Sequence, residues 1–238
     1  MQNNNDLFIS LFNRLDALLR DYYNIDNRST SCIKRYEDQL KHSSFEDVRD
    51  RGFILESIRN IRNTLVHEAK IDSEDAFLIS PIVTNFLEDE IHFLLNPIKA
   101  RNVMVPLKDV YYISKDSRIK DVINYMSSHY ISHAPILENK RVIGVFSEST
   151  LYTFLLKHEN IVLEDNTTIE TFLPYCLLDK HSSERFMFVD ADLSVLDLRE
   201  NFVKSKKEKR LVMLFLTENG RKDEPLLGIL TAADFIKD

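Results

Sequence analysis

Hydrophobic residues recur at helical spacing along the first 95 positions of the chain. In the first segment they stand three or four residues apart, which places them on one face of a helix: Leu7, Phe8, Leu11, Leu15, Leu18 and Leu19. Similar spacing predicts helices over about residues 33–41, 53–69 and 76–95. Within 1–96 the glycines and prolines, which interrupt helices, are limited to Gly52 and Pro81. The pattern therefore predicts an all-α bundle of about four helices.

The pattern changes after the segment NPIKA (96–100), where Pro97 disfavours a helix at the residue before it. Short runs rich in β-branched and aromatic residues then alternate with short amphipathic segments. These runs are DVYYI, HAPIL, VIGVF, RFMFV, RLVMLFL and LLGIL. We therefore expect an α+β fold, in which the helical bundle of 1–96 precedes a second domain over 97–238.

The second domain contains an internal repeat. A shift of 76 residues aligns VYYISKDSRIKDVINYM (110–126) with FMFVDADLSVLDLRENF (186–202), and a shift of 84 aligns VIGVFSEST (142–150) with LLGILTAAD (226–234). The chain has four glycines, and Gly144 and Gly228 stand at the same point of the two copies. Each copy, about 97–165 and about 166–238, reads as strand, helix, strand, strand and short helix.

This order of elements, together with the ending G-h-h-[S/T]-x-x-[D/T] of each copy, resembles a tandem pair of cystathionine-β-synthase (CBS) domains. The resemblance implies that the two copies pack through their sheets and form two clefts. It also implies a regulatory module that binds an adenine nucleotide, such as AMP, ADP, ATP or S-adenosylmethionine, and acts on a neighbouring domain.

The second copy carries residues that suit such a cleft. Asp234 offers two acceptors to the hydroxyls of a ribose, and Thr231 stands at the start of the last helix, where exposed N–H groups bond a phosphate. Gly228 permits a close approach of the backbone to a ligand. The resemblance places the adenine beside Phe186, Met187, Phe188, Leu211 and Val212. The run KSKKEKR (204–210) offers charge for a phosphate through Lys206, Lys207, Lys209 and Arg210.

The first copy departs from this pattern, because Thr150 stands where the second has its ribose aspartate. Ser147 and His133 remain as polar candidates for a phosphate there. An alternative applies to the motif itself: S/T-x-x-D is also a capping box, in which Thr231 and Asp234 satisfy the first N–H groups of their own helix. The lysine run has an alternative as a solvated loop. We expect one strong nucleotide site, in the second copy, and a weaker or vacant one in the first.

The segment ESIRNIRNTLVHEAK (56–70) has a second feature of interest. A helical wheel gathers one apolar stripe that we expect to face the bundle core: Ile54, Ile58, Ile61 and Leu65. Asn63 and His67 then fall almost opposite that stripe and can touch each other. On this basis His67 is either a solvated residue or part of an interface.

The sequence RNTLVH (62–67) resembles the R-x(4–6)-H motif of HEPN domains, which are helical bundles that commonly dimerise. Many members of that family are metal-independent ribonucleases. In that mechanism the histidine transfers the proton of the attacking 2′-hydroxyl and the arginine neutralises the phosphorane-like transition state. The resemblance assigns these roles to His67 and Arg62, with Asn63 as an orienting neighbour. Ala69 stands where HepT-like members have a tyrosine, so their tyrosine modification chemistry is not carried over.

Composition narrows the range of partners and compartments. The net charge of −7 and the pI of about 5.6 argue against a broad basic surface that coats duplex DNA. Cys32 and Cys176 form no CxxC pair, which argues against a zinc knuckle and suits a reducing cytosol. Four further histidines lack metal-ligand spacing, and we expect them on the surface: His42, His92, His158 and His181. With no secretory signal and no apolar run of membrane-spanning length, we expect a cytoplasmic protein without a metal.

Three functions follow from these patterns. In the first, the chain is a regulatory protein rather than an enzyme: the CBS pair senses an adenine nucleotide, and the helical domain responds through homodimerisation or through an RNA or protein partner. In the second, the helical domain is a HEPN ribonuclease gated by the nucleotide. In the third, the chain is a non-catalytic dimeric scaffold whose CBS clefts are vacant.

Overall fold

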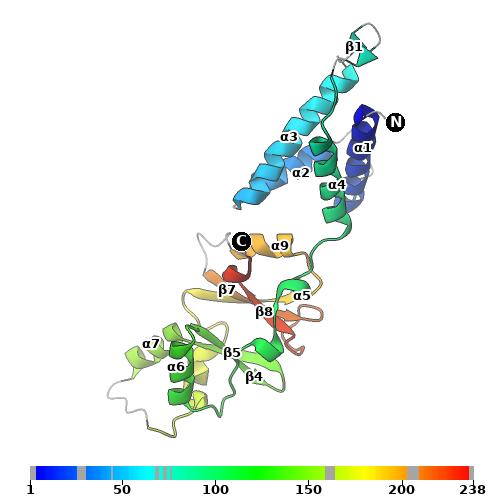
Figure 1. The fold of residues 1–238 in the computed structure, drawn as a ribbon. Helices are drawn as coiled ribbons and strands as arrows, with labels where there is room; N and C mark the ends of the chain where they lie inside the picture. Colours follow the sequence, from blue (N-terminus) through cyan, green and yellow to red (C-terminus); the bar gives the residue numbers. More distant parts are fainter. Residues whose placement is uncertain are drawn as a thin grey trace. The chain divides into compact units, whose positions relative to one another are not determined.

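The computed structural model describes residues 4–25, 31–43, 45–67, 70–71, 74–75, 77–158, 164–202 and 209–235. The chain divides into two compact units, Met1–Pro97 and Ile98–Asp238. Helices dominate the first unit, whereas helices and strands are mixed in the second (Figure 1). The fold is therefore a mixed one, as the change of pattern after residue 96 indicates.

The first unit consists of α1 (Asn4–Tyr23), α2 (Cys32–Lys41), α3 (Glu46–His67) and α4 (Pro81–Leu95), with a short antiparallel pair, β1 (Lys70–Ile71) and β2 (Glu74–Asp75). Helix α2 begins after Ser31, whose Oγ accepts a hydrogen bond from the N–H of Lys34. Helix α4 begins with Pro81 directly after the cap Ser80, at the position where a missing N–H removes no helical bond. The expected bounds were wrong at two places, since α3 begins before residue 53 and α4 begins after residue 76.

The inward face of α3 agrees with the predicted stripe only in part, because Ile58 is buried and Leu65 is half-buried. Ile54 and Ile61 are 44% and 36% exposed, whereas Val48, Leu55 and Ile58 are buried. The reason is electrostatic: arginines on α3 also turn toward neighbouring helices, because α2 and α4 each carry a buried carboxylate. Arg51 and Arg59 bind these carboxylates, so the inner face of α3 carries paired charges beside Val48, Leu55 and Ile58.

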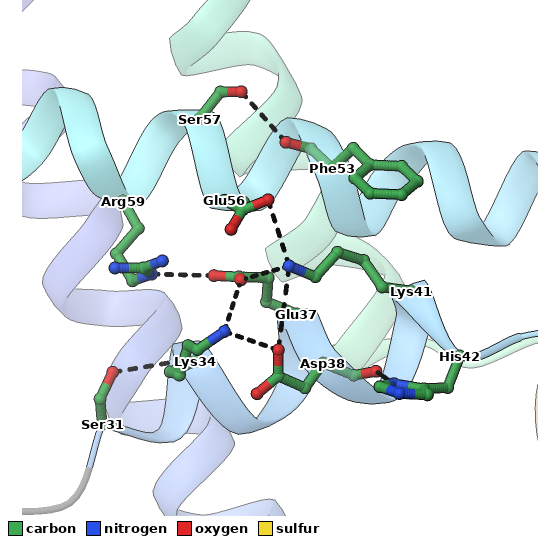
Figure 2. A network of polar contacts seen from close by, with 10 residues as sticks. All are labelled: Ser31, Lys34, Glu37, Asp38, Lys41, His42, Phe53, Glu56, Ser57 and Arg59. Atoms are coloured by element: carbon green, nitrogen blue, oxygen red, sulfur yellow. Dashed lines mark hydrogen bonds and ion pairs between the residues drawn. The ribbon is translucent and has the colours of Figure 1, made fainter.

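Glu37 of α2 is the first of these carboxylates, and Figure 2 shows it between α2 and α3. Its side chain is fully buried and accepts hydrogen bonds from Arg59 Nε at 2.8 Å, Lys41 Nζ at 2.9 Å and Lys34 Nζ at 3.1 Å. Burial raises the pKa of Glu37, but the bonds from Arg59, Lys41 and Lys34 outweigh it and lower the pKa to about 2. The carboxylate is thus charged and joins the two helices.

Glu90 of α4 is the second buried carboxylate, and it binds another arginine of α3. Arg51 binds it with two parallel bonds, Nε to Oε1 at 2.7 Å and Nη2 to Oε2 at 2.8 Å. The hydroxyl of Tyr36 donates to Oε2 at 3.2 Å. This cluster connects α2, α3 and α4 through one nearly buried carboxylate.

The second unit contains helices and strands in the following order. They are α5 (Ala100–Val103), β3 (Val105–Pro106), η1 (Leu107–Asp109), α6 (Ile119–Ser128), β4 (His133–Glu138), β5 (Arg141–Ser147), α7 (Glu148–Lys157), η2 (Ile169–Phe172), α8 (Leu173–Cys176), β6 (Glu184–Asp190), α9 (Val195–Arg199), η3 (Glu200–Phe202), β7 (Arg210–Thr217), β8 (Gly228–Thr231) and η4 (Ala232–Phe235). Here η denotes a 3₁₀ helix.

Two sheets carry the repeat. Strands β4 and β5 are antiparallel, and Ile113 adds an isolated parallel bridge to Ile136. The other sheet has the order β3-β8-β7-β6, in which β6 and β7 are parallel. Strand β3 lies near the start of the first repeat in sequence but pairs with β8 of the second. The predicted run DVYYI forms a bridge at Ile113 rather than a strand.

The register of the two hairpins shows which residues correspond. His133 pairs with Ser147 in the first repeat, and Met213 pairs with Thr231 in the second. Because Ser147 and Thr231 each follow the repeat's glycine by three positions, His133 corresponds to Met213 in the sheet.

Three apolar clusters support this unit. One lies within the first repeat, around Phe146 and Phe172, and another within the second, around Leu214 and Leu230. The third combines Val142 and Val145 of the first repeat with Phe215 and other residues of the second. The repeats therefore share a core. No helix in the described ranges has the length and hydrophobicity to cross a membrane.

Candidate functional site

A cleft of about 590 Å³ opens between the two repeats, and we call it the second cleft because the end of the second repeat forms part of it. Its walls come from three places: the β3–η1 segment and the start of β4 in the first repeat, and strands β7 and β8 with η4 in the second. The lining residues are Val105, Asp109, Val110, Tyr111, Tyr130, Ile131, Ser132, His133, Phe202, Arg210, Leu211, Val212, Met213, Ile229, Thr231, Ala232 and Ala233.

The second cleft combines apolar walls with a few polar groups. Apolar side chains from β3 and β7, such as Val105 and Leu211, offer a surface for a flat ring. Arg210 is exposed at one side and offers a planar donor to an anion. Asp109 adds one negative charge to the lining. Both the volume and this mixture are typical of small-molecule sites.

Thr231 and Asp234 make one arm of the capping box that the motif allows. Asp234 Oδ2 accepts from the backbone N–H of Thr231 at 2.7 Å and from Thr231 Oγ1 at 2.9 Å. A ribose hydroxyl would therefore bind Oδ1 of Asp234 or replace one of these bonds. Thr231 lines the second cleft, whereas Asp234 is not among the lining residues.

Gly228 makes room for a backbone contact. A Cβ at this position would meet the carbonyl oxygen of Val105, the β3 residue that lines the cleft. Its counterpart Gly144 has a similar neighbour, since a Cβ there would lie 2.6 Å from the carbonyl oxygen of Cys176. The two glycines therefore admit backbone from another segment, and Gly228 acts on the cleft through β3.

The predicted base-binding residues separate into two groups. Leu211 and Val212 line the second cleft. Phe186 and Phe188 instead pack against the apolar cluster between the sheets, and Met187 packs against the core of the second repeat. Of the predicted phosphate-binding charges, Arg210 lines the cleft, and Lys209 Nζ donates to the backbone carbonyl of His181. Lys206 and Lys207 lie outside the described residues.

A second constellation surrounds the carboxylate of Glu184, at the start of β6. Four side chains reach it: Ser149 Oγ at 3.0 Å, Ser147 Oγ at 3.3 Å and His181 Nδ1 at 2.9 Å from Oε2, and His133 Nε2 at 3.0 Å from Oε1. We call these five residues the Glu184 cluster. Glu184 is 8% exposed, Ser147 1% and His181 4%. The two residues predicted as phosphate ligands of the first repeat, Ser147 and His133, thus both contact Glu184.

Each ring nitrogen of His181 faces an acceptor. Nδ1 lies 2.9 Å from the carboxylate of Glu184, and Nε2 lies 3.3 Å from the carbonyl oxygen of Cys176. A hydrogen on Nδ1 is required for the bond to Glu184. His133 needs a hydrogen on Nε2 alone, because the hydroxyl of Ser132 can donate to its Nδ1 at 2.8 Å.

The environment of Glu184 favours its charged form. Burial raises the pKa of Glu184, but hydrogen bonds from His133 and His181 outweigh it and hold the pKa well below its usual range. Among the residues that the structure describes, no group of three or more His, Cys, Asp or Glu side chains is arranged to hold a metal ion.

A family model of the CBS domain matches residues 100–157. This segment is a CBS domain. It runs from α5 to the end of α7 and therefore includes Ser147, Ser149 and His133. The second repeat relates to this CBS domain through the shared register and the paired glycines described above.

Several solved structures resemble the chain. The CBS domains of a transcriptional regulator from Streptococcus pneumoniae share 15% identity and cover 60% of this chain and all of theirs, with a TM-score of 0.40. The acetoin utilization protein AcuB from Vibrio cholerae shares 19% identity over 59% of this chain and 89% of its own, with a TM-score of 0.43. The protein CBSX2, solved in complex with AMP, shares 14% identity over 58% and 92%, with a TM-score of 0.41. No curated protein sequence matches the chain significantly.

Sequence reasoning missed three members of the Glu184 cluster. His181 was expected on the surface and is buried, which corrects that prediction, while His42, His92 and His158 are exposed as expected. Glu184 and Ser149 were not predicted. Glu184 lies outside the G-h-h-[S/T]-x-x-[D/T] pattern, and Ser149 stands at one of its variable positions. One available signal was the polar stretch HSSE before β6, which is unusual at the start of a buried strand.

The residues of the R-x4-H motif lie on α3. The guanidinium of Arg62 lies 5.7 Å from the centre of the Phe12 ring on α1, and its Nη1 donates to Asn63 Oδ1 at 3.4 Å. Asn63 is exposed. His67 is the last residue of α3, and its side chain lies outside the described part of the structure. The geometry of Arg62 is that of a cation over an aromatic ring.

Proposed function

We propose that the chain is a regulatory protein that senses an adenine nucleotide in the second cleft and transmits its binding to the helical unit. The observation that carries the proposal is the second cleft itself, in which an apolar slot, Arg210 and Thr231 line one cavity between the two repeats. An adenine fits the slot between Val105 and Leu211, and a phosphate pairs with the guanidinium of Arg210.

The connection to the helical unit follows from the walls of the cleft. Val105 and Asp109 belong to the segment that follows the junction of the two units at Pro97 and Ile98. A ligand against these residues acts directly on the chain that leads to the helical unit. Such coupling requires the ligand to have different affinities for two arrangements of that segment.

Equilibrium binding of AMP, ADP, ATP and S-adenosylmethionine tests the proposal. AMP comes first, since it is the ligand solved with CBSX2. We expect at least one of the four to bind, and Arg210→Ala to weaken that binding by about tenfold, the loss of one charge-assisted contact. Arg221→Ala is the matched control, because Arg221 is exposed and outside the lining of the cleft. Equal affinities for the two variants would refute the assignment.

Hydrogen exchange tests the transmission step. A ligand that binds the second cleft should slow amide exchange in the segment 98–110, because β3 and η1 line the cleft. If exchange slows in the cleft strands β7 and β8 but not in the segment 98–110, the protein binds a nucleotide without passing the signal toward the helical unit.

A further inference from the structure

The Glu184 cluster occupies the place in the first repeat that the second cleft occupies in the second. Ser147 and Ser149 stand 84 residues before Thr231 and Ala233, and His181 stands 76 residues after Val105. His133 corresponds to Met213 through the register of the hairpins. The four counterparts, Val105, Met213, Thr231 and Ala233, all line the second cleft. The four donors of the cluster thus stand at the positions that would line a first cleft.

The chemistry of the cluster is that of an anion site. Two hydroxyls and two imidazole N–H groups converge on one carboxylate, each from 2.9 to 3.3 Å. Ser147 Oγ accepts a hydrogen bond from the backbone N–H of Thr150, and its own hydrogen can be donated to Glu184 at 3.3 Å or to Ser149 Oγ at 2.8 Å. Lys209 adds a cation beside the cluster, since its Nζ donates to the backbone carbonyl of His181.

We propose that the carboxylate of Glu184 is an internal ligand of the first cleft, which fills an anion site and prevents a nucleotide phosphate from binding there. Glu184 then determines the specificity of the module, because it leaves the second cleft as the nucleotide site. This part of the inference rests on the proposed function. The filling of an anion site by Glu184 stands independently of which nucleotide the second cleft binds.

Two physical effects exclude an external anion. The converging donors already form hydrogen bonds to the carboxylate, so they are not free to bind a phosphate. It would also meet a second negative charge within a site from which water is largely excluded, where like charges repel strongly. Removal of the carboxylate should therefore create a site, with donors from both repeats left without their acceptor.

Chemical rescue of Glu184→Ala tests the internal-ligand proposal. The probes are acetate and inorganic phosphate, each compared with sodium chloride at equal ionic strength. We expect both anions to raise the melting temperature of the variant, by roughly 3 °C at ten times the dissociation constant, and to leave the wild type unchanged. Glu148→Ala is the matched control, since Glu148 is an exposed carboxylate next to the cluster. It should behave as the wild type does.

The same test remains decisive if Glu184→Ala does not fold in chloride. Acetate or phosphate should then restore its circular dichroism spectrum. Glu184→Gln provides a second check, because the amide fills the space of the carboxylate and should show no rescue by acetate. The proposal is overturned if neither anion rescues Glu184→Ala, or if both anions stabilise Glu148→Ala and the wild type as much as they stabilise Glu184→Ala.

Titration calorimetry with AMP separates this inference from the proposed function. Both ideas together predict one AMP per wild-type chain and two per Glu184→Ala chain. If the wild type binds none of AMP, ADP, ATP and S-adenosylmethionine while Glu184→Ala shows anion rescue, the nucleotide function is refuted and the internal ligand stands. Two AMP molecules on the wild type, or one on each protein, overturn the claim that Glu184 closes the first cleft.

Discussion

His133 and Glu184 stand 51 residues apart, in different repeats, and their side chains meet with 3.0 Å between Nε2 and Oε1. His133 also lines the second cleft, so this one imidazole contacts the cluster on one side and borders the candidate nucleotide site on the other. A change in the second cleft can therefore reach the Glu184 cluster through this side chain.

The pH dependence of stability tests the charged state of Glu184. The pKa of Glu184 is held below its usual range in the folded chain, so as pH falls the unfolded chain takes up the proton first. The stabilising contribution is therefore present above about pH 4.5 and is lost progressively as the pH falls below it. The groups that face Glu184 are His133 and His181, with the two serines of the cluster. Lys209 faces the carbonyl of His181.

We expect the free energy of unfolding of the wild type to fall more steeply below about pH 4.5 than that of Glu184→Gln. Urea denaturation across the acid range measures both curves. Glu148→Gln, an exposed neighbour, should follow the wild type. Parallel curves for the wild type and Glu184→Gln would show that Glu184 is not stabilised as a carboxylate.

The buried carboxylate Glu37 should be important for the stability of the helical unit. In Glu37→Gln, Arg59 loses its carboxylate partner, whereas Lys34 keeps Asp38 and Lys41 keeps Glu56. We therefore expect a loss of about 2–3 kcal/mol, below the full range for a buried pair. Asp38→Asn removes a neighbouring carboxylate whose side chain is 44% exposed, and should cost less than about 1 kcal/mol. Urea unfolding followed by helical circular dichroism measures both. Equal losses would contradict the assignment.

The paired glycines offer a test of how β3 shapes the second cleft. A methyl group at either position meets a backbone carbonyl, so Gly228→Ala and Gly144→Ala should each destabilise the second unit by about 1–3 kcal/mol. Gly228→Ala displaces Val105, which lines the second cleft, and should also weaken nucleotide binding. Gly144→Ala acts beside Cys176 and should leave binding nearly unchanged. Thermal unfolding and calorimetry together distinguish the two, and equal binding losses would remove β3 from the site.

Arg62 has a structural role that can be separated from a catalytic one. Its guanidinium lies over Phe12, and Arg62→Ala should lower stability by about 0.5–2 kcal/mol. Arg14→Ala, an exposed position on α1, should be nearly neutral.

We expect the wild type to leave RNA intact. Cleavage that is lost in both Arg62→Ala and His67→Ala would establish the ribonuclease alternative instead.

Local pattern was sufficient to predict the repeat but not the contents of its clefts. The glycines and the [S/T] that follows them mark equivalent strand ends, because a close backbone contact and a capped helix each require a particular residue type at one position. The Glu184 cluster depends on residues from three separate stretches that meet through packing of the two sheets. The stretch HSSE marks His181 and Glu184 as unusual, but nothing local to Glu184 indicates that His133, Ser147 and Ser149 also contact it.

The helical unit shows a similar limit. Spacing alone predicted helices near the observed ones, yet the wheel of α3 placed Ile54 and Ile61 in the core. These two are exposed, because Arg51 and Arg59 bind Glu90 and Glu37 across the bundle. A hydrophobic wheel treats every charge as outward-facing, so it cannot anticipate a helix whose inner face carries paired charges.

A crystal structure of the chain grown with AMP tests the central claim most directly. We predict one AMP in the second cleft, with its base between Val105 and Leu211, its phosphate at Arg210 and the Glu184 cluster intact. AMP bound at Ser147 and Ser149 with Glu184 displaced, or a second cleft without AMP at saturating concentration, would contradict the account.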